Sequence, residues 1–255
     1  MRPLLLALLT CVVFDASALP APVRVEVVGE VKRPGVLQLP VGSRFADAVL
    51  VAMPTTNAYP LGAAMLRSSE MPEQKRRKAG VEYDLVAVAN HPDTTPAMAM
   101  QAKKLHQWLQ SLPVTGRIRA QLDPRRLEVD GSNRLLADSD FFVYPRRPTT
   151  IQVVGAVLHP CNLRHVPLQD AVDYLRQCEV DSAAVDRNSL FVVQPDGVIQ
   201  VLGSALWNRS PSVALAPGAI LYVPLDEAAL SRVAPRLNHD LAEFLATQFL
   251  SADLP

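Results

Sequence analysis

A segment near the start of the chain is repeated near its middle, and this repeat limits the possible folds more than any other feature. Residues 25–37 align without gaps with residues 151–163, at an offset of 126 positions. Six positions are identical: Val27, Val28, Gly29, Val31, Pro34 and Leu37 recur as Val153, Val154, Gly155, Val157, Pro160 and Leu163. Because 255 residues have room for two small domains, the repeat predicts two copies of one folding unit.

Each copy begins with the pattern of a strand followed by a turn. The partial alternation of "VRVEVVG", Val23 to Gly29, is typical of a half-buried strand. The glycine that ends this run allows a bulge or a close backbone approach. The dipeptide Pro34-Gly35 then predicts a turn, because proline presets φ and glycine tolerates a positive φ.

A short helix and further strands complete the unit. Residues 43–52, "SRFADAVLVA", predict a helix capped by Ser43, with Phe45, Ala48, Val49 and Ala52 on its buried face. In the second copy "QDAV" matches "ADAV", and "LAPGAILYVP" matches "LADSDFFVYP" in pattern. One helix packed over a small mixed sheet is the β-grasp arrangement, so the predicted fold class is α+β with two tandem β-grasp domains.

The first copy is interrupted before its last strands. A gap of about sixty residues is too long for a loop without structure. Its sequence contains "MPEQKRRKAGVEYDLVAVAN" and "TPAMAMQAKKLHQWLQSL", separated by the break "HPDTTP". We therefore predict a helical hairpin inserted at about residues 60–113. Thr95 would cap the second helix, whose apolar face would carry Met98, Leu105, Leu109 and Leu112.

The N-terminal residues 1–18 have the pattern of a secretory signal peptide. Arg2 precedes the apolar run "PLLLALLTCVV", and "ASA" fits the rule for a cleavage site. The run is too short to span a bilayer, although a buried N-terminal helix is the alternative explanation. Lipidation at Cys11 is not favoured, because Thr10 fits that motif poorly. We expect export to the periplasm of a Gram-negative cell.

The remaining composition excludes some classes of site and partner. The 25 basic and 25 acidic residues balance, which argues against a nucleic-acid partner. The sequence has no Cys-x-x-Cys or His-x-x-x-His pair, so we expect neither a metal site nor a cofactor. No later stretch is long enough to cross a membrane. Cys161 and Cys178 could form a disulfide in an exported chain, or could be two independent small apolar residues.

These motifs resemble a known family. The pattern V-x-V-x-G-x-V-x-x-P-G, followed by an Asp-Ala helix, resembles the SLBB module of Wza-type polysaccharide export proteins. "YPLGAAMLR", "SLPVTGR", "RRPTTIQVVGAV", "VVQPDGVIQVLGSALWN" and "PGAILYVP" are similar to the GfcC family of capsule biosynthesis proteins. The resemblance implies two SLBB-like domains, a helical insertion in the first, and a role in capsule or exopolysaccharide assembly. It implies possible partners of two kinds, a polysaccharide and an outer-membrane polysaccharide export protein.

Two places in the sequence are candidates for ligand binding. Arg117 follows "SLPVTG", a tight turn at the end of the insertion. Its guanidinium could donate two hydrogen bonds to a carboxylate or sugar acid there. The alternative is that Arg117 ties the hairpin to the body by a salt bridge. Trp207 and Asn208 are the second candidate, because an indole face can stack on a sugar ring. Here the alternative is ordinary packing.

The C-terminal residues "LNHDLAEFLATQFL" form an amphipathic pattern. One helical face would carry Leu237, Leu241, Phe244, Leu245 and Phe249. Wza-type exporters resemble this chain in ending with an amphipathic helix. We expect this helix to dock on a partner and not to span a membrane; packing back onto the body is the alternative.

The predicted organisation is therefore a signal peptide (1–18), domain 1 (19–147), domain 2 (148–226) and a C-terminal helix (227–255). The favoured function is a non-enzymatic accessory role in polysaccharide assembly or export, acting by binding. A periplasmic glycan-modifying enzyme with paired carboxylates, or a structural spacer without ligand, remains open at this point.

Overall fold

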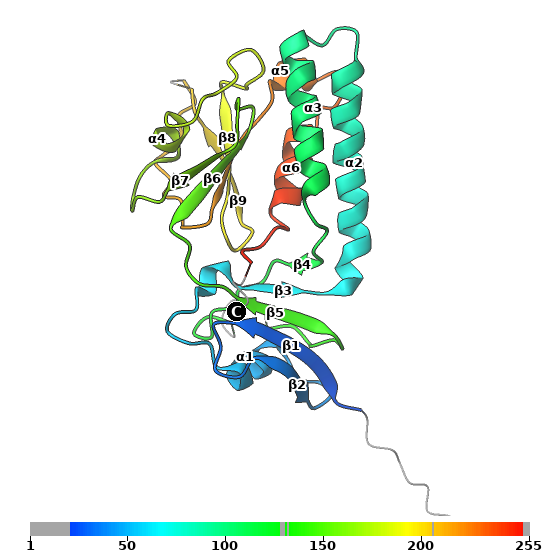
Figure 1. The fold of residues 1–255 in the computed structure, drawn as a ribbon, viewed down its shortest axis with the longest axis vertical. Coiled ribbons are helices and arrows are strands. Elements are labelled where there is room, and N and C mark those ends of the chain that lie inside the picture. The colour runs from blue at the N-terminus through cyan, green and yellow to red at the C-terminus, as the bar shows by residue number, and fades with distance from the viewer. Residues whose placement is uncertain (1–20, 128–130, 132, 206, 252–255) are drawn as a thin grey trace, which may run out of the picture.

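The computed structural model describes residues 21–127, 131, 133–205 and 207–251. The predicted signal peptide lies outside the described residues. Figure 1 shows an α+β protein with two sheets, one below the other, and a group of helices beside the upper sheet. Each sheet has five strands, and the two sheets are built from different halves of the chain.

The first sheet has the strand order β2-β1-β5-β3-β4. Its strands are β1 (Val23–Gly29), β2 (Gly35–Leu39), β3 (Ala64–Leu66), β4 (Arg117–Ile118) and β5 (Asp140–Tyr144). Strand β1 pairs antiparallel with β2 and parallel with β5. The helix α1 (Phe45–Ala52) supplies the predicted buried residues Phe45, Ala48, Val49 and Ala52.

The second sheet repeats this arrangement with the order β7-β6-β10-β8-β9. Its strands are β6 (Thr150–Gly155), β7 (Cys161–Arg164), β8 (Ser189–Val193), β9 (Ile199–Gly203) and β10 (Ile220–Val223). Strand β6 pairs antiparallel with β7 and parallel with β10, as β1 does with β2 and β5. The short helix α4 (Ala171–Leu175) takes the place of α1. The internal repeat is thus confirmed, strand for strand.

The repeated glycine ends the first strand of each copy. The residue after Gly29 donates its backbone N–H to the Tyr144 carbonyl over 2.8 Å, and the residue after Gly155 donates to Val223 over the same distance. Gly155 has a φ of 110°, and a Cβ added there would lie 2.0 Å from the Val223 oxygen. Only glycine fits this close approach, which explains why the sequence repeats it.

The predicted cap of α1 is wrong. The N-cap residue is Arg44, and Ser43 lies outside the helix. Asp47, in the first turn, accepts a 2.7 Å hydrogen bond from the Arg44 backbone N–H. An acidic side chain there satisfies a free backbone donor and complements the helix dipole, so a serine cap is not needed.

The inserted hairpin consists of α2 (Met71–Asn90) and α3 (Pro96–Ser111), which lie between β3 and β4. Thr95 caps α3 as predicted, accepting the Met98 N–H. The helices begin later than residue 60, because two 3₁₀ turns (Pro60–Gly62 and Ser68–Glu70) and β3 occupy that stretch. In the second copy, the equivalent strands β8 and β9 are joined by a tight turn at Asp196-Gly197.

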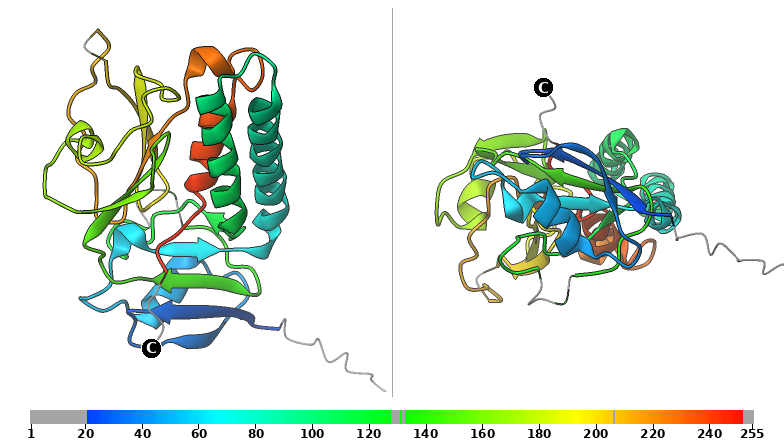
Figure 2. Two further views of the ribbon diagram at one scale, coloured as in Figure 1. Left: turned by 45° about the horizontal axis from the view of Figure 1, so that its top comes forward. Right: turned by 90° about the horizontal axis from the view of Figure 1, so that it is seen from below.

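The hairpin packs on the second sheet and not on the domain into which it is inserted. One core cluster combines α2 and α3 residues with the strands of the second sheet, whereas the core of the first sheet contains no hairpin residue among its members. Figures 1 and 2 show the helices covering one face of the second sheet, with α4 on the other side. The insertion therefore supplies the layer that the second sheet needs to bury its apolar face.

The C-terminal segment completes this layer. It forms α5 (Glu227–Leu230) and α6 (Leu237–Leu245), and α6 contacts both α2 and β8. In the described residues, no helix is both long and apolar enough to cross a bilayer.

The proposed docking face of α6 is buried inside the protein itself. Leu237, Leu241, Phe244 and Leu245 are each at most 1% exposed, and Phe249 is partly buried. The first four pack in the core of the second sheet and offer no free surface to a partner, whereas Phe249 follows α6 and lies at the edge of a hollow. The structure thus corrects the docking interpretation in favour of packing back onto the body.

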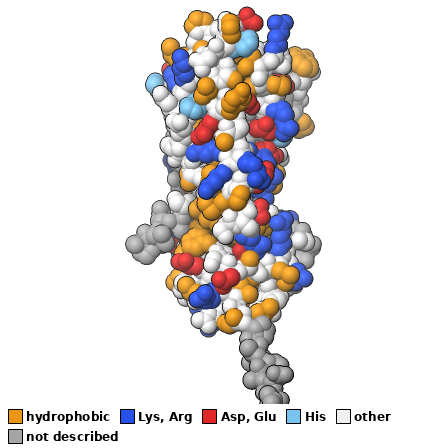
Figure 3. Space-filling model, turned by 90° about the vertical axis from the view of Figure 1, so that its right-hand side faces the viewer, with side chains coloured by type: hydrophobic (Ala, Val, Ile, Leu, Met, Phe, Trp, Pro, Cys, Tyr) orange, Lys and Arg blue, Asp and Glu red, His pale blue; other side chains and the backbone are white. Residues whose placement is uncertain are grey.

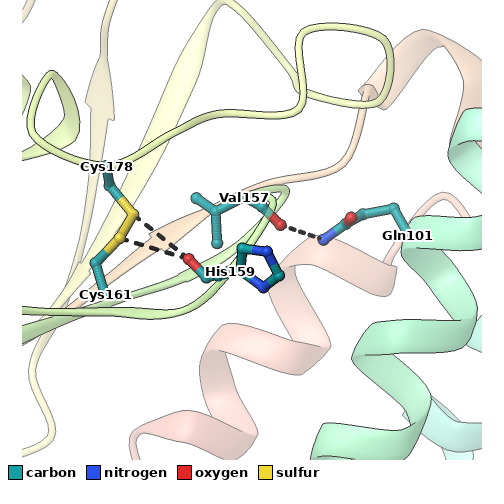
Figure 4. Close-up of a disulfide and its surroundings, with 5 residues drawn as sticks. All are labelled: Gln101, Val157, His159, Cys161 and Cys178. Atoms are coloured by element: carbon teal, nitrogen blue, oxygen red, sulfur yellow. Dashed lines mark hydrogen bonds between the residues drawn. A yellow bond between two sulfur atoms is a disulfide. The ribbon is translucent and has the colours of Figure 1, made fainter.

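A disulfide joins Cys161, at the start of β7, to Cys178, which follows α4. Figure 4 shows both sulfur atoms close to the His159 carbonyl, at 3.4 and 3.7 Å. The bond therefore holds the loop between β6 and β7 against the segment after α4.

Candidate functional site

Arg117 lies where the two sheets and the C-terminal segment meet. It begins β4, directly after Gly116, whose φ is 72°. A Cβ at Gly116 would lie 2.5 Å from the Arg67 carbonyl oxygen, so this tight exit from the hairpin requires glycine. The buried side chain of Gln74, on α2, fixes the same turn by bonding the Gly116 N–H and the Arg117 carbonyl.

The guanidinium of Arg117 bonds backbone carbonyls and no carboxylate. One terminal nitrogen donates to Gln248 in the C-terminal segment, and the other donates to Pro195 in the β8–β9 turn. Its Nε is also buried and has no hydrogen-bond partner among the described residues. The residue is 5% exposed, and its burial lowers the pKa of the guanidinium to about 10.

The role of Arg117 is therefore different from either explanation offered by the sequence. Both terminal nitrogens already bond backbone carbonyls and the side chain is buried, so the guanidinium is not open to a sugar acid in this structure. It does tie the hairpin exit to the body, but through carbonyls and not through a salt bridge. Thr115 adds a parallel link by donating to the Thr247 carbonyl over 2.7 Å.

A cleft of about 290 Å³ lies over this junction, between β4, α2 and α6. Arg77 and Arg119 in its wall both bond Glu243, each at 3.2 Å. Figure 3, which looks at the side of α2, shows basic and acidic side chains interspersed over that face. Glu243 thus holds two of the arginines of the cleft, and Glu73 pairs with Arg76 on α2.

Trp207 and Asn208 follow β9, whereas Arg117 contacts the turn that precedes β9, so the strand separates the two candidates. Trp207 is 78% exposed. The Asn208 side chain accepts from the Ala205 N–H and donates to the Asn188 carbonyl. Asn208 thus shapes its own loop, and the structure does not assemble the sequence-predicted residues into one site.

A second concave region, which the sequence did not indicate, lies between α3 and the second sheet. Two hollows of about 340 and 300 Å³ share one lining residue, Trp108 on α3. Trp108 reads as an ordinary apolar residue of an amphipathic helix, because only the tertiary structure places the second sheet opposite it. Its helical position alone gives no signal of function.

The positions of three aspartates bear on the enzyme hypothesis, which requires paired carboxylates. Asp140 is buried and holds Arg67 in a two-pronged pair at 2.8 and 2.7 Å, so it serves the first core. Asp84 and Asp240 line a shallow cleft between α2 and α6. Partial burial, and then the charge of Asp240, raise the pKa of Asp84. In the part of the chain that the structure describes, no cluster of His, Cys, Asp and Glu could hold a metal ion.

Two segments of the chain match known families. Residues 159–249, which form most of the second sheet together with α5 and α6, match the family described as capsule biosynthesis GfcC C-terminal. Residues 24–59, which form β1, β2 and α1, match the SLBB domain. These matches support the GfcC-like capsule biosynthesis family for this chain. The predicted resemblance to the GfcC family is thereby confirmed over residues 159–249.

The chain is also similar to YjbG of Escherichia coli (strain K12), which is described as an uncharacterised protein. The two are 33% identical over 155 residues, which make up 60% of this chain and 62% of YjbG. The match therefore spans less than two thirds of that relative. The description of the first family names capsule biosynthesis, and the name of YjbG adds no activity.

Proposed function

We propose that this protein is a non-enzymatic accessory protein of capsule or exopolysaccharide assembly or export. It acts by binding, either to the glycan or to a component of the export machinery. The observation that carries the proposal is the GfcC C-terminal match over residues 159–249, together with the SLBB match near the N-terminus. Both GfcC-like elements, the second sheet and the C-terminal helices, share one core with the inserted hairpin.

The proposed location is the periplasm. A disulfide between Cys161 and Cys178 supports an oxidising compartment, where such bonds persist. The signal-peptide pattern of residues 1–18 supports the same location. Fusing residues 1–20 to a phosphatase that is active only outside the cytoplasm tests the leader directly. An inactive fusion would count against export.

A partner in the outer membrane is part of the proposal, but not through the apolar face of α6. That face is buried, so an export protein would contact other surfaces. A structural spacer, the alternative without a ligand, would fit the tie that Arg117 makes between the two sheets.

The enzyme alternative rests on one observation, the raised pKa of Asp84 beside Asp240. A general acid in glycoside cleavage needs a raised pKa and a second carboxylate nearby. Incubation of the pure protein with the producing bacterium's own polysaccharide, followed by an assay of new reducing ends, tests this. New ends that disappear with Asp84→Asn would favour the enzyme.

The function itself is tested by deleting the gene in the producing bacterium. We expect less polysaccharide on the cell surface, with chains of unchanged composition accumulating inside the envelope. Restoring the gene should restore the surface polysaccharide. Unchanged amounts and location of polysaccharide in the deletion strain would contradict the proposed function.

A further inference from the structure

The groove at Trp108 combines features of a ligand site that the junction at Arg117 lacks. Trp108 stands where the two hollows meet, and it is only partly buried against the core. The larger hollow lies over β6, β7 and the C-terminal segment, and the smaller one lies over the loop after β6. Together they have the size of a small-ligand site, lined by apolar groups with a few polar ones.

Two amide side chains face the larger hollow from neighbouring strands. Gln152 on β6 and Asn162 on β7 are direct partners in the antiparallel register, so their side chains lie on the same face of the sheet. Both line the hollow, and neither side chain has a hydrogen-bond partner among the described residues. Opposed residues of an antiparallel pair have Cβ atoms about 5 Å apart, so both amides can reach one ligand.

A buried acceptor without a partner lies beside the smaller hollow. Gln101 on α3 is 2% exposed, and its Nε2 donates to the carbonyls of Gly155 and Val157, at 2.6 and 3.2 Å. Figure 4 shows this nitrogen directed at Val157. Because carbonyls only accept, the amide orientation is fixed and Oε1 must face elsewhere. Oε1 has no partner among the residues that the structure describes, although Gln101 lines the hollow.

An unpaired buried acceptor is costly, and native proteins nearly always satisfy such atoms with a donor. Oε1 has less than 1 Å² of accessible surface, so it lies behind the wall of the hollow and a ligand in the hollow does not reach it. The disulfide keeps the opposite wall in place, since both sulfur atoms contact the carbonyl of His159 in that wall. The site is thus held in shape before any ligand arrives, which lowers the entropic cost of binding.

The charges of the groove indicate what kind of ligand it accepts. The larger hollow has no Asp, Glu, Lys or Arg among its described lining residues. In the smaller hollow, the described lining includes one cation, Lys104, and the titratable His159. Hydroxyl groups match free amides, and the apolar face of a pyranose ring matches an indole.

We infer that this groove is a saccharide site that binds an uncharged segment of a glycan across Trp108. The indole stacks on a sugar ring, and Gln152 and Asn162 bond its hydroxyls. This inference rests on the proposed function and deepens it by assigning a site and a ligand class.

The two tryptophans of the chain allow a direct test by fluorescence. Trp207→Phe leaves Trp108 as the only tryptophan, and Trp108→Phe leaves the exposed Trp207. Each variant is titrated with neutral oligosaccharides released from the producing bacterium's polysaccharide, with commercial gluco-, galacto- and manno-oligosaccharides, and with oligogalacturonate as the acidic comparator. We expect a saturable change in emission from Trp108 with an uncharged probe, and none from Trp207.

Binding affinities of alanine variants complete the test. Trp108→Ala should weaken binding by roughly tenfold or more, the usual effect of removing a central aromatic anchor. Asn162→Ala changes an exposed side chain without partners, so it should weaken binding while the melting temperature stays constant. Trp207→Ala is the matched control and should bind like the unchanged protein. Circular dichroism of each variant shows whether the fold is kept.

The outcomes separate the groove from the function. If intact polysaccharide binds equally to the Trp108→Ala and unchanged proteins, the groove is not the site, but the proposed function stands. If only oligogalacturonate binds, the ligand class is wrong. If no saccharide changes Trp108 emission, the groove inference falls, and the gene deletion alone then decides the proposed function.

Discussion

At the scale of single residues, the environment of a side chain decides its role more than its chemical type. The guanidinium of Arg117 has the shape that suits a sugar acid, yet both of its terminal nitrogens donate to backbone carbonyls of distant segments. Asp140 reads as an ordinary turn residue, yet it forms a buried ion pair with Arg67. A sequence shows which donors and acceptors exist, but not which partners reach them first.

We predict that Arg117→Ala destabilises the protein by about 3 kcal/mol, because two buried carbonyls lose their donors and a cavity is left. Arg119→Ala is the control. Its side chain is 52% exposed and pairs with Glu243, so its loss should cost less than about 1 kcal/mol. Urea unfolding of both variants measures the difference. Equal losses would mean that Arg117 is not a structural tie.

A second residue-level prediction concerns pH. The pKa of Asp84 is raised, first by burial and then by Asp240. The folded state therefore favours the protonated carboxyl, so the stability that it contributes at low pH is lost as pH rises through the folded pKa. Asp84→Asn should raise the melting temperature more at pH 7 than at pH 4.

Glu73 is a control for this experiment, because its pKa is shifted in the opposite direction. Hydrogen bonds from Arg76 lower its pKa, so its contribution is present at neutral pH and is lost on acidification. Glu73→Gln should therefore lower the melting temperature more at pH 7 than at pH 4. The same pH dependence in both variants would contradict this account.

At the scale of elements, the two copies keep the same residue where the backbone geometry allows only glycine. Gly155 cannot carry a side chain, because the Val223 carbonyl occupies that space. Gly35 also has a positive φ, of 106°, but nothing lies within 4 Å of the position of a Cβ. A substitution at Gly155 therefore tests steric exclusion by a neighbouring strand, and a substitution at Gly35 tests backbone strain alone.

We predict that Gly155→Ala costs roughly 3 kcal/mol or more, because β6 and β10 must move apart. Gly35→Ala should cost about 1–2 kcal/mol, the ordinary penalty of a left-handed conformation. Equilibrium unfolding of both variants checks the ranking. A smaller loss for Gly155→Ala would show that the strands adjust without cost.

At the scale of the whole molecule, the two copies differ in how they complete their cores. The first core contains residues of its own sheet, α1 and nearby loops. The second core needs α2 and α3 from the first copy, and α6 from the C-terminus. The hairpin occupies the place where the second copy has only the Asp196-Gly197 turn. An insertion in the first domain thus covers the apolar face of the second sheet.

This difference predicts how fragments behave. Replacing residues 68–114 by a short glycine-containing turn, within a fragment of residues 19–147, should leave the first core folded. Residues 148–251 alone should stay unfolded or bind a hydrophobic dye, because their sheet lacks the covering helices. Circular dichroism and amide exchange of the two fragments test this. A well-folded C-terminal fragment would overturn the assignment of the shared core.

The repeat, the strand-turn-strand-helix unit, both inserted helices and the resemblance to the GfcC family were all predictable from the sequence. These features follow from local periodicity, turn chemistry and caps, which act over a few residues. The apolar faces of α3 and α6 were also visible, but not what covers them. Burial of apolar surface has no direction, so an amphipathic helix does not specify its partner. Tertiary packing decided that α6 lies in the core and that the second sheet lies opposite Trp108. It also decided that the guanidinium of Arg117 donates to backbone carbonyls.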